Sequence, residues 1–571
     1  MDGFREVMFH RFLKTSRWLF GAGWFLLISS SAWGGHWHVK KVKLEKREPV
    51  PAPEFKSAVS TKNLLQLSRP NPSALPFARS STAAAVETLK ILALRVEFQE
   101  EIPDDPTTTG SGAFDRRTQQ DFLTQEGHLV DPAPHDKEYF KSHIQALDRF
   151  YQAVSNGRLK VTGEVWPPVD SEAYQLPVAH AYYGSSGPYA DSAIVVQISR
   201  FFKDGVRLAD SVSPEIDFSA YQALVIFHAG SSRQDDIFGN SPNDFFTGLL
   251  RLGDSVLVDN DSSVITEGMI LPESPSQDNR IVGLNASFAH EFGHQLGLVD
   301  LYNTETLITQ VGDFSLMDNN GQDVAAELDF TPVGGRIVLA SGLLPVYPDA
   351  WSRAFLGFLD TLVVTRGPIN LSLLAGELQR KSTEAVKIPI SEQEYFIIEN
   401  RSVDFDSFPG SALKVDPVTG VVLGPARPDA DSSVFTVEYD MLLPGSGILI
   451  WHIDEAVALE AGCADDLGNL YSRFTCNTVN NNSARRFLEL EEADGFVDFG
   501  GNYYTGAFGF AEDMFWAPNN TGFTPTSNPS TRSKFGGQTG ISVTSIGSAD
   551  TLMSFSISSD YLLPGWPQYA A

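Results

Sequence analysis

The sequence predicts a mixed α/β (α+β) domain followed by a second domain rich in β-strands. In the first part of the chain, apolar β-type runs alternate with segments of helical period. After residue 360, short β-type runs are separated by Gly, Pro and Asp. A chain of 571 residues is also too long for one hydrophobic core, so two or more domains are expected.

The first domain is expected to span residues 89–360. Strands and helices that alternate along a chain are typical of an α/β layered domain. A short helix at 350–358, with core aromatic residues, is expected to close this domain. The alternating elements are expected at 89–98 (strand), 139–154 (helix), 159–165 (strand), 193–202 (helix) and 224–229 (strand).

The β-rich domain is expected to span residues 361–560. Its strands are short and carry the β-branched and aromatic residues that favour sheets. We expect them at 362–364, 369–374, 385–390, 395–399, 434–437, 447–453, 541–546 and 552–557.

One stretch of the first domain carries chemistry. His290, Glu291 and His294 have the spacing H-E-x-x-H. On a helix, residues four apart lie on one face, so the two imidazoles can meet at one zinc ion with a position left open for water. Glu291 follows the first ligand and is placed to act as general base on that water.

The residues after the motif extend it. Gly297 can stop the helix in a left-handed conformation and let the chain return Asp300 to the metal. The full pattern H-E-x-x-H-x-x-G-x-x-D has the metzincin spacing with Asp as the third ligand. Met317, in the turn-like segment 313–318, is a candidate for the methionine turn that metzincins place beneath the metal. If Asp300 is not the third ligand, Asp318 or a more distant Glu must be.

Other chemistry-bearing residues are interpreted as structural. His143, His228 and His452 fall on apolar faces or strand ends, where buried histidines usually serve packing. Glu399 and Asp454 are candidates for calcium ligands or for residues that support the site. The segment 259–263 lacks the full spacing of a calcium loop and is interpreted as a polar turn.

The charge and the two cysteines bound the environment of the protein. Its formal charge of −29 argues against nucleic acid or an anionic membrane as partner. Cys463 and Cys476 are close enough for one small-loop disulfide in an oxidising compartment, although the sequence leaves their pairing open. Neither precedes the zinc motif, which excludes a propeptide cysteine that blocks the metal.

The ends of the chain resemble export and linker segments. Residues 1–34 have a basic start, a short apolar core and a small-residue cleavage site, which predicts a secretory signal. Residues 35–88 are rich in Pro, Ser and Ala and are expected to form a propeptide or a disordered linker. Residues 561–571 are expected to form a tail. We therefore expect a secreted protein without a stable membrane span, with the periplasm or cell surface as alternatives.

Further motifs lie at 290–302, 315–320, 349–358, 394–401, 443–454 and 492–495. Together they resemble the immune inhibitor A family of secreted bacterial metallopeptidases, in the broader form called M6-like. The resemblance runs from about Leu89 to Ile557. It implies a secreted zinc endopeptidase with protein or peptide substrates, and leaves the oligomeric state open. Zn²⁺ is the expected catalytic ion and Ca²⁺ a further, structural candidate. The alternatives are a catalytically silent surface or binding protein with the same fold, and a metallohydrolase with a non-protein substrate.

Overall fold

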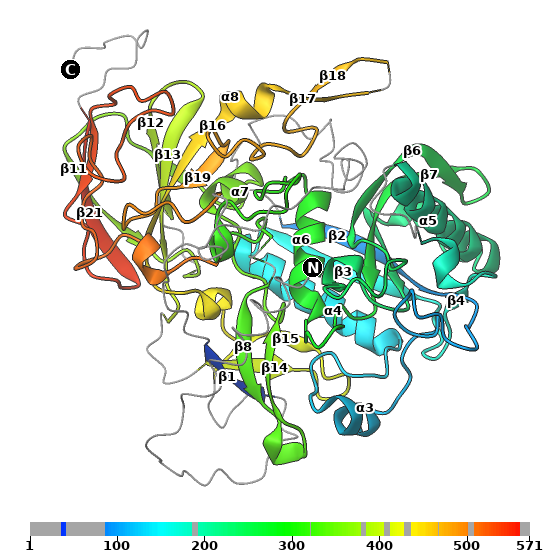
Figure 1. The fold of residues 1–571 in the computed structure, drawn as a ribbon. Helices are drawn as coiled ribbons and strands as arrows, with labels where there is room; N and C mark the ends of the chain where they lie inside the picture. The colour runs from blue at the N-terminus through cyan, green and yellow to red at the C-terminus, as the bar shows by residue number, and fades with distance from the viewer. Residues whose placement is uncertain are drawn as a thin grey trace.

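The structure is a computed structural model that describes most of the chain (Figure 1). The predicted signal segment and the predicted tail lie outside the described residues, so both stay predictions. The described residues are 36–41, 86–184, 192–319, 321, 323–378, 384–404, 411–427, 435–465, 467–500 and 508–559.

The fold is mixed, with many strands and few helices, as the sequence predicts. The helices of the described part are α3 (Gln119–Glu126), α4 (Lys137–Val154), α5 (Ser192–Val212), α6 (Leu284–Gln295), α7 (Ala350–Phe355) and α8 (Glu455–Leu459). None of the helices in the described ranges is long and apolar enough to cross a membrane.

The first sheet forms the α/β half of the molecule. Its strand order is β3-β2-β5-β7-β6, and β4 pairs with the end of β2. Neighbouring strands are parallel except β6, which runs antiparallel to β7 at one edge. The strands are β2 (Glu87–Glu97), β3 (Leu159–Trp166), β4 (Tyr174–Gln175), β5 (Ala223–His228), β6 (Gly248–Val258) and β7 (Ser263–Pro272).

Helices cover both faces of this sheet. The alternating side chains of β5 show the arrangement, because every residue of that strand is buried. Phe227 packs against Phe140 of α4 and Phe288 of α6, with ring centroids 4.5 and 5.5 Å away. His228, on the opposite face, packs against Phe201 of α5. Helices α4 and α6 thus lie side by side on one face of the sheet, and α5 covers the other face.

The β-rich half contains two packed sheets. One has the order β10-β12-β13-β16-β19 and the other β11-β21-β20. Phe396 and Ile398 of β13 face a core shared with the second sheet, whereas Tyr395 and Ile397 belong to the main core. The strands are β10 (Thr361–Val363), β11 (Ile369–Leu374), β12 (Ala385–Pro389), β13 (Glu394–Arg401), β16 (Gly447–Asp454), β19 (Leu488–Leu490), β20 (Ile541–Thr544) and β21 (Leu552–Ser559).

A third sheet, with the order β15-β14-β1-β8-β9, joins distant parts of the chain. Its strand β1 pairs with β8 and β14 although it lies within residues 35–88, which we expected to be a propeptide or disordered linker. The predicted domain boundaries otherwise stay predictions. The strands are β1 (His36–Lys41), β8 (Ala325–Asp329), β9 (Ile337–Ser341), β14 (Ser411–Val415) and β15 (Val422–Ala426).

A buried ionic network connects the β-rich half to the loop that follows α6. Arg401 of β13 pairs with Asp440 and also donates to Phe314 O at 3.2 Å and Tyr347 O at 3.3 Å. Glu377 lies beside this pair, 3.6 Å from Arg401 Nε. Phe314 lies directly before the turn that contains Met317, so the network fixes the backbone at the start of this turn. In Figure 1, α6 lies at the centre of the molecule, between the α/β half and the β-rich half.

Some of the expected elements differ in the structure from their predicted form or extent. The described part of the expected strand 434–437 forms only an isolated bridge between Phe435 and Ala426. Helix α5 continues to Val212, ten residues beyond the expected end. The polar turn expected at 259–263 is the tip of the β6–β7 hairpin, with Asp259, Asn260 and Asp261 at positive φ.

Candidate metal centre

Helix α6 carries the H-E-x-x-H motif and is anchored at its start by other elements. Asp131 Oδ2 accepts a hydrogen bond from Leu284 N at 2.7 Å, and Gly342 O accepts one from Ala286 N at 3.1 Å. These contacts satisfy two of the N–H groups that every helix start leaves free. The carboxylate also lies at the positive end of the helix dipole. The beginning of α6 is therefore held rigidly against the loop before α4 and the end of β9.

The end of α6 reverses the chain. Gly297 has a φ of +106°, a conformation that favours glycine. Leu298 N donates to Gly293 O at 3.0 Å, which closes the last turn of the helix. The reversal returns Asp300 to the face of α6 that carries both histidines.

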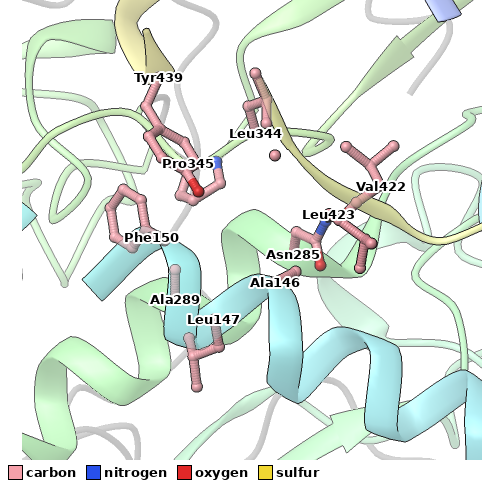
Figure 2. A pocket seen from close by; sticks show the side chains of 11 residues that line it. Ala146, Leu147, Phe150, Asn285, Ala289, Leu344, Pro345, Val422, Leu423 and Tyr439 are labelled. Atoms are coloured by element: carbon pink, nitrogen blue, oxygen red, sulfur yellow. Dashed lines mark hydrogen bonds between the residues drawn. The ribbon is translucent and has the colours of Figure 1, made fainter. Parts of the chain in front are cut away.

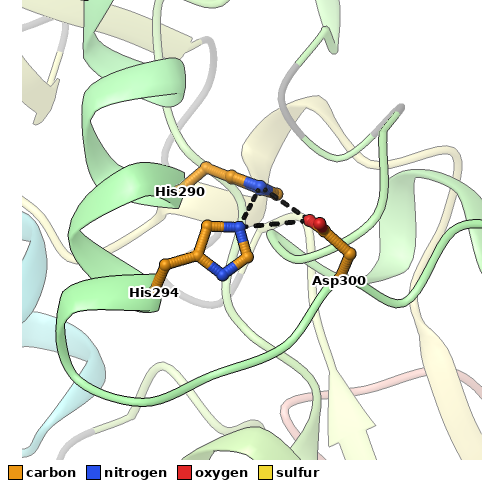
Figure 3. A group of neighbouring side chains, drawn as sticks. All are labelled: His290, His294 and Asp300. Carbon is orange, nitrogen blue, oxygen red and sulfur yellow. Dashed lines mark hydrogen bonds and ion pairs between the residues drawn. The ribbon is translucent and has the colours of Figure 1, made fainter. Parts of the chain in front are cut away.

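His290, His294 and Asp300 form one compact cluster (Figure 3). His290 Nε2 lies 3.0 Å from His294 Nε2 and 3.0 Å from Asp300 Oδ1, and His294 Nε2 lies 3.2 Å from the same oxygen. All three side chains are at most 2% exposed. Three ligand atoms about 2.0–2.2 Å from one tetrahedral ion stand roughly 3.3 Å apart, so the cluster has the dimensions of a metal site.

The second nitrogen of each imidazole fixes its tautomer. His290 Nδ1 lies 2.8 Å from Leu316 O, and His294 Nδ1 lies 3.0 Å from Leu298 O. A carbonyl oxygen only accepts, so each Nδ1 must carry the proton and donate it. In neutral histidines both Nε2 lone pairs then face each other and a carboxylate. Only a cation at this point, a metal ion or a proton, makes the arrangement favourable.

Glu291 lies next to the cluster and points at the edge strand of the first sheet. Its Oε2 accepts a hydrogen bond from Leu249 N of β6 at 2.8 Å. The side chain is 5% exposed. Glu291 is therefore held beside the cluster but is not one of the three side chains whose ligand atoms converge.

Met317 packs against the motif helix between the two histidines. A Cβ placed on Gly293 would lie 2.9 Å from Met317 Sδ, closer than real Cβ contacts come. Two backbone carbonyls of this turn also accept hydrogen bonds. Met317 O accepts from Leu301 N, and Leu316 O accepts from His290 Nδ1. The turn thus supports both His290 and the segment that carries Asp300.

The pKa shifts in the cluster favour a cation among these side chains. Burial raises the pKa of Glu291, while His290 and His294 act in the opposite direction. Burial works to lower the pKa of His294, but Asp300 raises it to about 9. Burial works to raise the pKa of Asp300, but the two imidazoles lower it. Burial, with Asp300 and Glu291, also raises the pKa of Tyr302 well above its usual range.

Two residues at the site escaped the sequence analysis. Asn477, from the β-rich half, forms hydrogen bonds with both the backbone and the side chain of Asp300. Tyr302, two residues beyond Asp300, lies close enough to interact with it and with Glu291. The position of Tyr302 directly after the motif is a usable signal, whereas nothing local in the sequence marks Asn477.

Asp318, the alternative third ligand, has another role. Its carboxylate accepts hydrogen bonds from Thr309 Oγ1, from Gln310 N at 2.8 Å and from Val311 N at 2.8 Å. These contacts close the loop between Leu301 and Met317. The histidine cluster contains Asp300 and not Asp318.

The three histidines interpreted as structural all make contacts within the fold. His143 Nδ1 lies 2.9 Å from Asn285 Oδ1 and joins α4 to α6. His228 Nδ1 lies 2.9 Å from Ala229 O. His452 Nε2 lies 2.9 Å from Glu394 Oε1 in the β-rich half.

The two carboxylates considered for calcium are engaged by arginine and other donors. Glu399 accepts from Arg353 Nη2 at 2.6 Å and from Trp451 Nε1 at 2.7 Å. Asp454 pairs with Arg485 at 2.8 Å and begins α8. In the described part of the chain, two other groups could hold an ion: His452 with Glu489 and Glu491, and Glu492 with Asp498 and Asp513.

The two cysteines are joined in a disulfide. Cys463 lies in β17 (Ala461–Ala464), which pairs with β18 (Leu470–Ser472), and Cys476 follows that hairpin. Their Cα atoms are 5.9 Å apart. The residue after Cys476 is Asn477, so the disulfide lies next to the contact with Asp300.

A small pocket lies on another side of α6 (Figure 2). Ala289 and Asn285 of α6 line it together with Leu147 and Phe150 of α4, and Tyr439 closes one end. Its lining is mainly apolar, and no member of the metal cluster belongs to it. The pocket is part of the packing between α4, α6 and β15 and is separate from the candidate centre.

Comparison with known proteins adds little to this geometry. No family model and no curated protein matches the chain. Among solved structures, the chain is similar to catalytically inactive OgpA from Akkermansia muciniphila in complex with an O-glycopeptide (glycodrosocin) substrate. The identity is 13%, the match covers 67% of this chain and 93% of that chain, and the TM-score is 0.18. So low a score carries no inference, and the fold and the site define an α+β protein with a candidate metal centre.

Proposed function

We propose that this protein is a secreted, zinc-dependent endopeptidase with a metzincin-like catalytic domain, of the immune inhibitor A (M6-like) type. The single observation that carries the proposal is the tautomer-fixed pair of Nε2 atoms that face Asp300 Oδ1 within 3.0–3.2 Å. Two imidazoles and one carboxylate form a donor set that suits zinc and leaves a coordination position open. The resemblance of the sequence motifs supports the family.

Bound zinc would lower the pKa of a water molecule and polarise the scissile carbonyl. His290, His294 and Asp300 would hold the ion, and the carbonyl oxygens of Leu316 and Leu298 keep the two imidazoles in orientation. Glu291 accepts the proton of the attacking water and then donates it to the leaving amine. Burial raises the pKa of Glu291, which makes this carboxylate a stronger base.

Strand β6 offers a place for the substrate backbone. It is the last strand of its sheet in the described part of the chain, and its Leu249 N–H points at Glu291. An extended peptide can add to such an edge through main-chain hydrogen bonds. A peptide placed there lies beside Glu291 and the metal, which favours cleavage within a chain.

Export is part of the same proposal. The disulfide between Cys463 and Cys476 is typical of an oxidising compartment and supports secretion. Calcium in the β-rich half is proposed as a structural ion, at one of the acidic groups described above.

The test is hydrolysis of casein by the purified mature protein and by its Glu291→Gln variant, with zinc content measured in both. We expect one zinc per chain in each and activity about 10²–10⁴-fold lower in the variant. A protein with one zinc and no hydrolysis of any unstructured protein supports the silent-protein alternative. Equal activity in both proteins contradicts the role of Glu291.

A further inference from the structure

The third ligand of the candidate centre is held by a residue 177 positions away in the sequence. Asn477 Oδ1 accepts a hydrogen bond from Asp300 N at 2.7 Å, and Asn477 Nδ2 donates to Asp300 Oδ2. The two oxygens of the Asp300 carboxylate therefore have different partners. Its Oδ1 faces the imidazoles, while its Oδ2 is bound by the amide.

This contact fixes the orientation of the carboxylate as well as its position. A single hydrogen bond to Oδ2 would leave the side chain free to rotate about it. The amide also binds the backbone N–H of the same residue, so the rotation is restricted. Asn477 is buried, and its amide N–H supplies a hydrogen-bond donor to the carboxylate of Asp300.

Asn477 is itself placed by an unusual backbone conformation. Its φ is +55°, which asparagine adopts more readily than most residues. The neighbouring residue, Cys476, is fixed by the disulfide to Cys463 and by a hydrogen bond from its N–H to Ser472 O. The disulfide thus anchors the chain one residue before the contact with Asp300.

The residues after Asn477 bind the chain after Asp300. Thr304 Oγ1 donates to Asn477 O at 2.9 Å, and Thr304 N donates to Asn481 Oδ1 at 2.9 Å. Asn480 Nδ2 donates to Leu301 O at 2.8 Å. The segment 477–481, which we call the asparagine segment, therefore follows residues 300–304 closely.

We propose that Asn477 is a positioning residue that orients Asp300 toward the metal, and that the Cys463–Cys476 disulfide keeps Asn477 in place. Metal affinity is then coupled to the oxidation of this disulfide and to the docking of the β-rich half. The inference rests on the metal centre of the proposed function, but it does not require that the protein cleaves peptides.

The experiment measures Zn²⁺ affinity by competition with a chelating dye, on full-length mature protein in a Glu291→Gln background that prevents self-digestion. Asn477→Gly removes the amide and tolerates the positive φ. Asn477→Asp keeps the shape and the backbone preference but replaces the N–H donor with a second carboxylate. Asn481→Ala is the matched control, because it removes contacts with Thr304 and none with Asp300.

We expect both Asn477 variants to bind Zn²⁺ about 10–100-fold more weakly, the effect typical of residues that orient a metal ligand. Asn477→Asp should be the weaker binder, because two carboxylates then face each other. A side chain that only fills space would give the reverse order. The visible spectrum of the Co²⁺-loaded protein should also change in both variants and stay unchanged in Asn481→Ala.

The disulfide is tested with the double variant Cys463→Ser, Cys476→Ser. We expect weaker Zn²⁺ binding, and we expect Asn477→Gly to add little in this background because both changes act through the same contact. Thermal unfolding in EDTA checks that each variant is folded.

Different failures have different meanings. A parent protein that binds no Zn²⁺ overturns the proposed centre and this inference together. Zinc binding equal in the parent and both Asn477 variants overturns the role of Asn477 and leaves the centre intact. Equal weakening by Asn481→Ala shows loop packing in place of orientation and also overturns it. An unchanged affinity in the double serine variant overturns the role of the disulfide.

Discussion

The Nε2 atoms of His290 and His294 lie 3.0 Å apart, although both nitrogens are acceptors once their rings donate through Nδ1. Two lone pairs at this distance repel each other, so the fold holds the two nitrogens in a geometry that becomes favourable only when a cation lies between them. The helix, its glycine-ended turn and the methionine turn together hold the two rings in place. The predictions below test separate parts of that construction.

Replacing Asp300 by Asn should weaken metal binding much more than it changes the fold. The amide keeps the size of the side chain but removes the negative charge that faces the two imidazoles. We expect a loss in Zn²⁺ affinity of more than about 100-fold, beyond the range for residues that only orient a ligand. Dye competition measures this loss.

The matched control is Asp318→Asn. Asp318 accepts three hydrogen bonds within its loop, so its loss should lower the free energy of unfolding by about 1–3 kcal/mol. Zinc affinity should change little. A larger loss of Zn²⁺ affinity in Asp318→Asn than in Asp300→Asn would show that Asp318, and not Asp300, is the third ligand.

Gly293→Ala should destabilise the protein through Met317. Alanine gains about 1 kcal/mol of helix propensity over glycine. Its Cβ would lie 2.9 Å from Met317 Sδ, and crowding of this kind in a core costs about 1–3 kcal/mol. Met317 is fully buried and its backbone is hydrogen-bonded to Leu301, so its sulfur has little room to move away, and chemical denaturation should show a lower free energy of unfolding.

The same change should reverse its sign when the sulfur is absent. In a Met317→Ala background, itself destabilised by about 2–5 kcal/mol, Gly293→Ala should be neutral or stabilising. A double-mutant cycle that gives additive effects would mean that Met317 does not pack against the helix at Gly293.

Glu377 should make stability depend on pH. Burial and the adjacent Asp440 raise its pKa well above the model-peptide value of 4.5, and Arg401 acts in the opposite direction. The folded chain therefore keeps this proton to higher pH than the unfolded chain does. Stability from this group is present below pH 4.5 and is lost as pH rises from there toward the folded pKa.

Glu377→Gln should remove that loss, because a neutral amide needs no proton. We expect the variant to be at least as stable as the parent at pH 7, with a flatter dependence on pH. The exposed Glu392→Gln is the control and should leave the profile unchanged. A variant that is less stable than the parent at pH 7 contradicts the raised pKa of Glu377.

Removal of the metal should destabilise the whole fold. A ligand present at 100 times its dissociation constant stabilises the native state by about 2.7 kcal/mol. EDTA should therefore lower the melting temperature, and added Zn²⁺ should restore it. The His290→Ala protein, which lacks a ligand, should show no such response.

The sequence predicted the parts of the fold and site that are local. The motif and the glycine after it lie within one helix and its turn, so their spacing alone brings His290, His294 and Asp300 toward one point. Strands β2, β3 and β5 of the first sheet were found because they carry buried apolar runs, whereas β4, β6 and β7 of the same sheet were not predicted. Such signals need no knowledge of the rest of the chain.

Long-range contacts were not predictable in this way. Asn477 reaches Asp300 across 177 residues, and in the sequence it is one of several asparagines in a loop. Strand β1 is short and mostly polar, so its own sequence gives no strand signal. It forms because β14 and β8 pair with it on either side. The edge strand β6 was missed because several of its outer residues are exposed and polar.

The most direct test of the central claim is X-ray absorption at the zinc edge on the purified mature protein. We predict one zinc per chain, bound by two imidazole nitrogens and by oxygen at about 2.0–2.2 Å, without sulfur. The imidazole signal should disappear in His290→Ala. Two results would contradict the account. One is a purified protein that contains no zinc and takes up none when Zn²⁺ is added. The other is a zinc environment that is unchanged in His290→Ala.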